Sequence, residues 1–286
     1  MAATDRARRE GHFEGAGGVE IFWRAWIAPE TPRATAVLAH GASEHSGRYA
    51  HVAAAMNERG YSLWALDHQG HGRSGGDRAV IERLEYSIED LDRLVVMAAE
   101  ELPGQQPYLL GHSMGGMLAT AYTIRHEERL AGLILSGPVA VLETASAVQR
   151  GLSHVLSRVA PTLGVYTIDS QGVSRDPDVV RDYDSDPFNH HGKMPVRTVA
   201  EMANEVDTFP LSARAISIPI LIMHGGSDPI VPVAGSQLLH ERVSSEDKTL
   251  TIYDGLYHEI LNEPEQDDVI AEICAWLDAR TEPVTA

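Results

Sequence analysis

The stretch PYLLGHSMGGMLATAYTIRH, residues 107–126, decides the fold. Its apolar first part predicts a buried strand over 107–113, and the spacing that follows predicts a helix over 114–126. The junction reads Gly-x-Ser-x-Gly, whose glycines permit a sharp turn that holds the Ser113 hydroxyl out over the end of the strand. Unrelated sequences also contain this bare pattern by chance. The alternative to a functional site is therefore a tight turn with an ordinary serine. Because a strand precedes it and small residues open the helix, we predict that Ser113 is a nucleophile.

Outward from this turn, short apolar strands alternate with amphipathic helices. Strands are predicted at 19–28 (the second arm of a hairpin), 35–41, 62–72 (running into a Gly-rich loop), 130–138, 218–228 and 248–255, and helices at 48–60, 87–102 and 267–280. Ser87, with Asp90 three residues later, is close to a capping box and predicts where the second helix starts. This alternation indicates an α/β protein with a mostly parallel central sheet and helices on both faces. Catalytic residues of such sheets gather at the carboxyl ends of the strands.

The interval 139–212 breaks the rhythm and predicts a helical cap inserted between two parts of the core, 1–138 and 213–286. An apolar stripe at helical spacing runs along its first half, comprising Val141, Ala145, Val148, Leu152, Val155, Leu156, Val159 and Leu163. The stripe could wall a tunnel for an apolar chain, pack the cap against the core, or do both. The alternative for the whole interval is a small separate domain with no role at the site.

A serine nucleophile needs a base, and the base needs an acid to orient it. Where a Gly-x-Ser-x-Gly turn joins strand to helix, the acid and then the histidine follow the serine along the chain. Asp228 leaves a later strand and His258 follows the next one, so we predict the triad Ser113, Asp228 and His258. The competing acids are Asp254, which lies in a turn, and Glu259, which we expect to face solvent or the rim of the site.

Two backbone N–H groups are predicted to stabilise the oxyanion of an acyl-transfer reaction. One belongs to Met114, the residue after the nucleophile. The other comes from the loop after the first parallel strand, His40-Gly41-Ala42, which makes Ala42 the candidate.

Composition excludes several classes of function. The net charge of −18 argues against nucleic acid as a partner and against simple attraction to anionic lipid. The N-terminal residues carry charges with no apolar stretch behind them, and no run reaches the ~20 apolar residues of a transmembrane helix. We therefore expect a soluble, cytoplasmic protein whose contact with a membrane or the cell envelope is peripheral. His68 and His71 are three residues apart, but no third metal ligand is evident nearby, so no metal site is predicted.

Five segments in this order resemble the monoacylglycerol lipase family of the α/β-hydrolase fold, and the resemblance is closest to its bacterial, actinobacterial-type members. The segments are HGASEHSGRY (40–49), DHQGHGRSGG (67–76), GHSMGG (111–116), GSDPIVP (226–232) and YHEILNEP (257–264). The resemblance implies a serine hydrolase without a cofactor that cleaves monoacylglycerols to a free fatty acid and glycerol through an acyl-enzyme on Ser113. It also implies that Ala42 and Met114 supply the oxyanion donors.

The same resemblance implies that Glu44 and Arg48 shape a polar pocket for the glycerol headgroup and that Tyr183, in the YDSDP segment of the cap, lines the site. A carboxylate and a guanidinium would supply the acceptors and donors that glycerol hydroxyls need. The alternative for Glu44 and Arg48 is a plain i, i+4 pair at the start of a helix.

Other activities stay open at this point. A broader carboxylesterase or a lysophospholipase would use the same triad, and a non-catalytic receptor on a hydrolase scaffold is the alternative outside enzymes. A lipid substrate would bring the cap into transient contact with a membrane. Acyl-chain preference and oligomeric state are not predicted.

Overall fold

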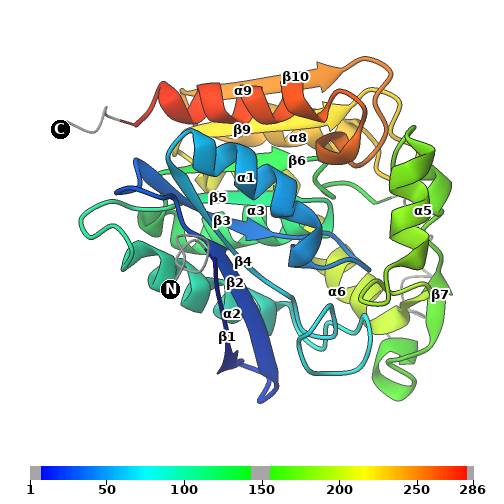
Figure 1. The fold of residues 1–286 in the computed structure, drawn as a ribbon. Coiled ribbons are helices and arrows are strands. Elements are labelled where there is room, and N and C mark those ends of the chain that lie inside the picture. Colours follow the sequence, from blue (N-terminus) through cyan, green and yellow to red (C-terminus); the bar gives the residue numbers. More distant parts are fainter. Residues whose placement is uncertain (1–7, 143–154, 282–286) are drawn as a thin grey trace.

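An eight-stranded sheet forms the centre of the molecule (Figure 1). The computed structural model describes residues 8–142 and 155–281. In spatial order the strands are β1 (Arg8–Glu14), β2 (Glu20–Trp26), β4 (Tyr61–Leu66), β3 (Ala34–Ala39), β5 (Tyr108–His112), β6 (Gly132–Ser136), β9 (Ile220–Gly225) and β10 (Lys248–Tyr253). The β1–β2 hairpin and the β2–β4 pair are antiparallel, and the other neighbours are parallel. The predicted α/β class, with a mostly parallel sheet, is confirmed.

Helices cover both faces of this sheet. One face carries α1 (Ala50–Glu58) and α9 (Gln266–Asp278), and the other carries α2 (Leu84–Ala99), α3 (Met114–His126) and α8 (Ala234–Arg242). Successive residues of β3 show the two cores, because side chains of a strand alternate between faces. Leu38 belongs to the cluster of α1 and α9, whereas Val37 belongs to that of α2 and α3.

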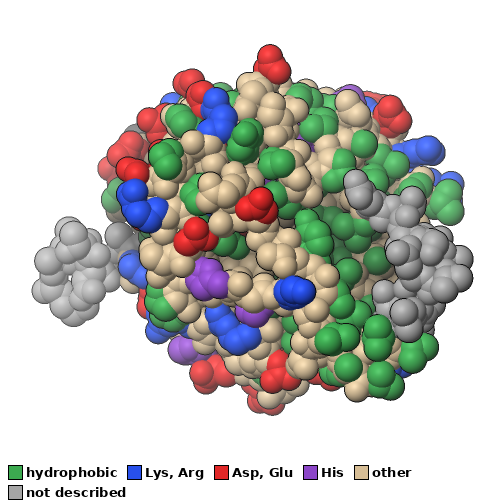
Figure 2. Space-filling view, turned by 90° about the vertical axis from the view of Figure 1, so that its right-hand side faces the viewer, with side chains coloured by type: hydrophobic (Ala, Val, Ile, Leu, Met, Phe, Trp, Pro, Cys, Tyr) green, Lys and Arg blue, Asp and Glu red, His purple; other side chains and the backbone are tan. Residues whose placement is uncertain are grey.

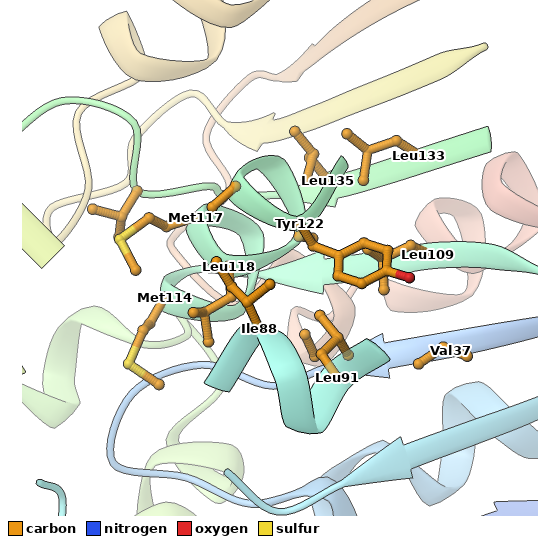
Figure 3. Close-up of a cluster of buried hydrophobic side chains, with 14 of the residues drawn as sticks. Val37, Ile88, Leu91, Leu109, Met114, Met117, Leu118, Tyr122, Leu133 and Leu135 are labelled. Carbon is orange, nitrogen blue, oxygen red and sulfur yellow. The ribbon is translucent and has the colours of Figure 1, made fainter. Parts of the chain in front are cut away.

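The core under α2 and α3 supports the predicted nucleophile turn. Figure 3 shows Leu91 of α2 and Leu118 of α3 in one buried cluster with Val37 of β3. Met114, the first residue of α3, is fully buried in the same cluster. Removing the apolar surface of these side chains from water contributes about 25 cal/mol per Å². This burial holds the start of α3 against the sheet.

The predicted start of the second helix is wrong. Helix α2 begins at Leu84 rather than after Ser87, and both Ser87 and Asp90 are buried within it. Its first N–H group, on Leu84, donates to the Glu201 carboxylate at 2.8 Å. A side-chain acceptor from another element therefore caps this helix. The local sequence had suggested Ser87 for that role.

Between β6 and β9 the chain leaves the sheet and forms elements beyond the carboxyl ends of the strands (Figure 1, green to yellow-green). They include a helical turn over residues 155–159, β7 (Gly164–Tyr166), α5 (Pro177–Ser185), β8 (Met194–Pro195), α6 (Val196–Val206) and α7 (Phe209–Ser212). The stripe positions Ala145, Val148 and Leu152 lie outside the described residues. Within the described ranges, no helix is both long and apolar enough to cross a membrane.

Candidate active site

The turn after β5 holds Ser113 in a strained backbone conformation. Its φ is +55° and its ψ −119°, a region that side-chain-bearing residues rarely adopt. The Ser113 N–H donates to the Ser136 carbonyl at 3.0 Å, and its own carbonyl accepts from the N–H groups of Met117 and Val139, both at 3.1 Å. These hydrogen bonds to β6 and α3 keep the turn in this conformation.

Gly115 lets the turn approach the neighbouring strand. A Cβ at this position would lie 2.0 Å from the carbonyl oxygen of Ala39, which no real contact tolerates. The glycine two residues after Ser113 is therefore required by the close passage of α3 over the end of β3.

The structure brings Ser113, His258 and Asp228 together from three separate loops. His258 Nε2 lies 2.9 Å from Ser113 Oγ, and His258 Nδ1 lies 2.7 Å from Asp228 Oδ2. All three side chains are largely buried. The competing acid Asp254 is exposed beyond β10.

Asp228 is held as an anion by its surroundings. Its Oδ1 accepts the backbone N–H groups of Ile230 and Val231 at 2.8 and 2.9 Å, and His224 Nε2 lies 3.1 Å from Oδ2. Burial alone would raise the pKa of Asp228, but His258 and these donors outweigh it and hold the pKa well below the ordinary value.

The environment of His258 favours its protonated form. Burial by itself would lower the pKa of this imidazole. The charge and hydrogen bond of Asp228, followed by the charges of Glu259 and Glu44, outweigh burial and raise the pKa above its ordinary value. His258 can therefore accept a proton from Ser113 and hold it.

The two predicted oxyanion donors come from the start of α3 and from the loop after β3. Met114 is the first residue of α3, where an N–H group has no partner inside the helix. Ala42 lines the same cavity as Ser113, and within the described residues its N–H donates to no acceptor.

Buried hydrogen bonds fix the loop that carries Ala42. The Gly41 N–H donates to Glu44 Oε1 at 2.6 Å, and His40 Nδ1 donates to the Gly41 carbonyl at 2.7 Å. The other ring nitrogen of His40 accepts the His68 N–H at 3.0 Å. Burial, followed by the neighbouring histidines, keeps the pKa of His40 well below its ordinary value, so the ring stays neutral in this role.

Glu44 and Arg48 are bonded to each other and also contact tyrosines from two parts of the chain. Arg48 Nη1 donates to Glu44 Oε2 at 2.9 Å, and the Tyr49 hydroxyl donates to Glu44 Oε1 at 2.6 Å. The guanidinium also lies 4.9 Å from the centre of the Tyr183 ring, which belongs to α5. Glu44 and Tyr183 line the cavity beside Ser113, and Arg48 lies behind them.

The expectation that Glu259 faces solvent or the rim is wrong. Only 4% of Glu259 is exposed, and its two oxygens accept from Arg48 Nη1 and Nη2 at 2.6 and 2.8 Å. Asn262 donates to the same carboxylate at 3.0 Å. The sequence signal was a carboxylate directly after His258, but its partner Arg48 lies 211 positions away.

None of the described residues of the apolar stripe lines the cavity beside Ser113, and Val141 and Leu156 among them are partly buried. Val155, Val159 and Leu163 are 56%, 72% and 46% exposed. The apolar lining of the cavity comes instead from Ile168, Val173 and Ile230. Ile168 and Val173 lie in irregular chain after β7, where no helical periodicity could reveal them.

Comparisons with known proteins agree with this geometry. A family model described as serine aminopeptidase, S33, matches residues 30–265. A monoacylglycerol lipase of Mycolicibacterium smegmatis is 43% identical over 94% of this chain and 97% of its own length. The human monoglyceride lipase is 34% identical over 94% of this chain and 90% of its own.

A solved structure of the monoacylglycerol lipase of Paleococcus ferrophilus is similar in fold as well as in sequence. It superposes with a TM-score of 0.82 at 30% identity, covering 91% of this chain and 99% of that one. Both sequence relatives are matched over nearly their whole length, so the similarity includes the core and the region beyond the sheet. The chain therefore belongs to the monoacylglycerol lipase family of the α/β-hydrolase fold.

Proposed function

We propose that this protein cleaves monoacylglycerols to a free fatty acid and glycerol through an acyl-enzyme on Ser113. The observation that carries the proposal is the hydrogen-bonded series Ser113–His258–Asp228, which ends in a cavity lined by both polar and apolar side chains. The names of the sequence relatives support the substrate class.

In the first half of the reaction, His258 Nε2 accepts the Ser113 proton while Oγ attacks the ester carbonyl carbon. Asp228 holds the imidazole in the tautomer that leaves Nε2 free to accept, and it stabilises the imidazolium that forms. When the tetrahedral intermediate collapses, His258 gives the proton to the glycerol oxygen and the alcohol leaves. Water then repeats the sequence on the acyl-enzyme and releases the fatty acid.

The N–H groups of Ala42 and Met114 would stabilise the negative charge on the carbonyl oxygen in both tetrahedral intermediates. Each such donor contributes about a hundredfold to a thousandfold in rate. The hydrogen bond from His40 Nδ1 to the Gly41 carbonyl orients the peptide that carries the Ala42 donor, and the bond from the Gly41 N–H to Glu44 holds the peptide before it.

The polar and the apolar lining residues of the cavity suit the two ends of a monoacylglycerol. Glu44 and Tyr183 would meet the glycerol hydroxyls, with Arg48 holding both in place from behind. The acyl chain would run along Ile168, Val173 and Ile230. In this proposal residues 139–212 act as a cap over the core segments 1–138 and 213–286.

A substrate panel tests the headgroup assignment. We expect kcat/KM for a monoacylglycerol to exceed that for the methyl ester of the same acyl chain by about tenfold or more, since each hydrogen bond to a charged group contributes roughly 1.5–3 kcal/mol. Glu44→Ala should remove most of this difference. Equal rates on the two esters in the wild-type enzyme would favour a broader carboxylesterase.

The outer face of the cap suggests how the enzyme reaches a lipid substrate. Between residues 155 and 166, five hydrophobic side chains are more than two-fifths exposed: Val155, Val159, Leu163, Val165 and Tyr166. Figure 2 looks onto this end of the molecule, where hydrophobic side chains gather toward one side. A patch of this kind marks an interaction surface. We propose that it makes transient contact with membranes.

Val159→Glu should therefore weaken binding to neutral phosphatidylcholine vesicles while leaving hydrolysis of a dispersed short-chain monoacylglycerol unchanged. Val159 is the most exposed member of the patch, so a charge there costs little in folding. Val96→Glu is the matched control, because Val96 is 41% exposed on α2, outside the cap. Vesicle co-sedimentation measures the effect, and equal loss in both variants would count against the patch.

A further inference from the structure

A buried cluster of three charges lies against the candidate active site. Arg48 is bonded on one side to Glu44 and on the other, through two hydrogen bonds, to Glu259. Glu44 is 2% and Glu259 4% exposed. One guanidinium neutralises one carboxylate, so the cluster holds one surplus negative charge when both glutamates are ionised.

The surplus charge faces the reaction cavity. Glu44 and Glu259 both line the cavity next to Ser113 and His258, whereas Arg48 does not, and no lysine or arginine is among its described lining residues. The Arg48 donors that the structure pairs all go to the two carboxylates. A bound ligand would therefore meet the negative side of the cluster.

The remaining titratable groups at the cavity do not offset this charge. The rings of His112 and His258 are tilted relative to each other with centres 4.8 Å apart, and burial lowers the pKa of His112 to about 3, so it is neutral. His258 is neutral when it acts as the base, and Asp228 behind it adds a further negative charge. Tyr183 is uncharged, because burial raises its pKa.

The two carboxylates differ in how firmly they stay ionised. Burial would raise the pKa of Glu259, but the charge and hydrogen bonds of Arg48 outweigh it and hold that pKa below the ordinary value. Burial, with Arg48 offsetting it only in part, raises the pKa of Glu44. As the pH falls Glu44 gains a proton first, so the discrimination argued below is greatest at pH 8.

We propose that Glu259 is a specificity-determining residue that makes the cavity select esters of uncharged, hydroxyl-bearing alcohols and reject those with an anionic headgroup, such as acylglycerol phosphates. This inference rests on the proposed function and refines its substrate class. Carboxylate oxygens accept hydrogen bonds from glycerol hydroxyls but repel a phosphate. In a water-poor cavity this repulsion is screened far less by salt than at the surface.

The test compares Glu259→Gln with the wild-type enzyme on two substrates that share one short acyl chain, a monoacylglycerol and an acylglycerol phosphate. Both are used as dispersed monomers at pH 8, so that micelle charge plays no part. Glutamine keeps the size and the acceptor oxygen of the side chain but removes the surplus charge. The ratio measured is kcat/KM for the phosphate ester divided by kcat/KM for the neutral ester. For a phosphate about 7–10 Å from the Glu259 carboxylate, this ratio should rise about tenfold to fiftyfold.

Glu205→Gln is the matched control. Glu205 is also a buried glutamate that accepts two hydrogen bonds from one arginine, Arg125, at 2.9 and 3.0 Å, but it lies between α6 and α3 and away from the cavity. Its substrate ratio should stay at the wild-type value. An unchanged ratio in folded Glu259→Gln would overturn the proposal, as would an equal rise in the control.

A pH profile separates this role from a merely structural one. The charge of Glu259 raises the pKa of His258, so its removal should lower that pKa and move the acid limb of kcat/KM to lower pH. The groups that remain to act on His258 are Asp228, Glu44 and His112. If the acid limb of kcat/KM in Glu259→Gln stays at the wild-type pH, Glu259 carries no charge that acts on His258.

Two further outcomes keep the inference distinct from the proposed function. If Glu259→Gln does not fold, Glu44→Gln removes the other carboxylate that lines the cavity, and the ratio should rise in the same direction. If the wild-type enzyme does not prefer monoacylglycerol to the methyl ester, the proposed function itself fails. If it does and neither glutamine variant changes the ratio, only the specificity role fails.

Discussion

Ser113→Ala is expected to lower kcat for monoacylglycerol hydrolysis by about a millionfold, which is the effect of removing the nucleophile of a serine hydrolase. The methyl group cannot form the acyl-enzyme, and only the oxyanion donors and substrate binding would remain. Because Ser113 Oγ makes its hydrogen bond to His258 at the edge of a cavity, its loss leaves the core intact. Steady-state kinetics measures the loss, and circular dichroism checks the fold.

An organophosphonate tests the same assignment without a variant. It should add its mass to the peptide that contains Ser113 in the wild-type enzyme and to no peptide of Ser113→Ala. A labelled Ser136 or Ser43, the other buried serines near the turn, would count against the assignment.

Ser113→Gly should be as inactive as Ser113→Ala but more stable. The positive φ of this residue is strained for any side chain, and glycine adopts it freely. We expect the free energy of unfolding of the glycine variant to exceed that of the alanine variant by about 1 kcal/mol. A thermal melt measures the difference. Equal melting temperatures would mean that the turn stores no such strain.

Local sequence predicted the elements whose signals are local. Helix α3 begins and ends at the predicted residues, 114 and 126, because the nucleophile turn fixes its start. The positions of Asp228 and His258 followed from strand order along the chain, since the carboxyl ends of parallel strands converge. The structure places His258 beside Ser113 and Asp228 beside His258.

What the sequence could not predict depends on partners far along the chain. Helix α2 starts three residues before Ser87 because Glu201, 117 positions beyond Leu84, caps it. Asp90, which looked like part of a capping box, instead accepts a hydrogen bond from the Ala16 N–H at 2.7 Å. This bond ties the N-terminal hairpin to α2. Glu259 gave no sign of burial, because its cation is on the loop that follows β3. In each case a tertiary contact decided between two local possibilities.

Asp228→Asn is expected to lower kcat by about ten-thousandfold while leaving the geometry in place. An asparagine offers an N–H where His258 Nδ1 now donates to Oδ2 at 2.7 Å, which favours the wrong tautomer and removes the charge that stabilises the imidazolium. Its side-chain oxygen can still accept the Ile230 and Val231 N–H groups, so the loop should keep its shape. Asp254→Asn is the control: that carboxylate is exposed, and its variant should keep wild-type activity.

The pH dependence of the same variant tests the electrostatic part of this argument. In the wild-type enzyme the pKa of His258 is raised above about 6.5, chiefly by Asp228 acting against burial, so activity should be lost as the pH falls through that raised value. Without the Asp228 charge, burial dominates and the pKa of His258 falls. The acid limb of kcat/KM in Asp228→Asn should therefore lie at lower pH, although the maximum rate is far smaller. A limb at the wild-type position would show that Asp228 orients His258 without stabilising its charged form, and a profile flat to about pH 4 in the wild-type enzyme would argue against a histidine base.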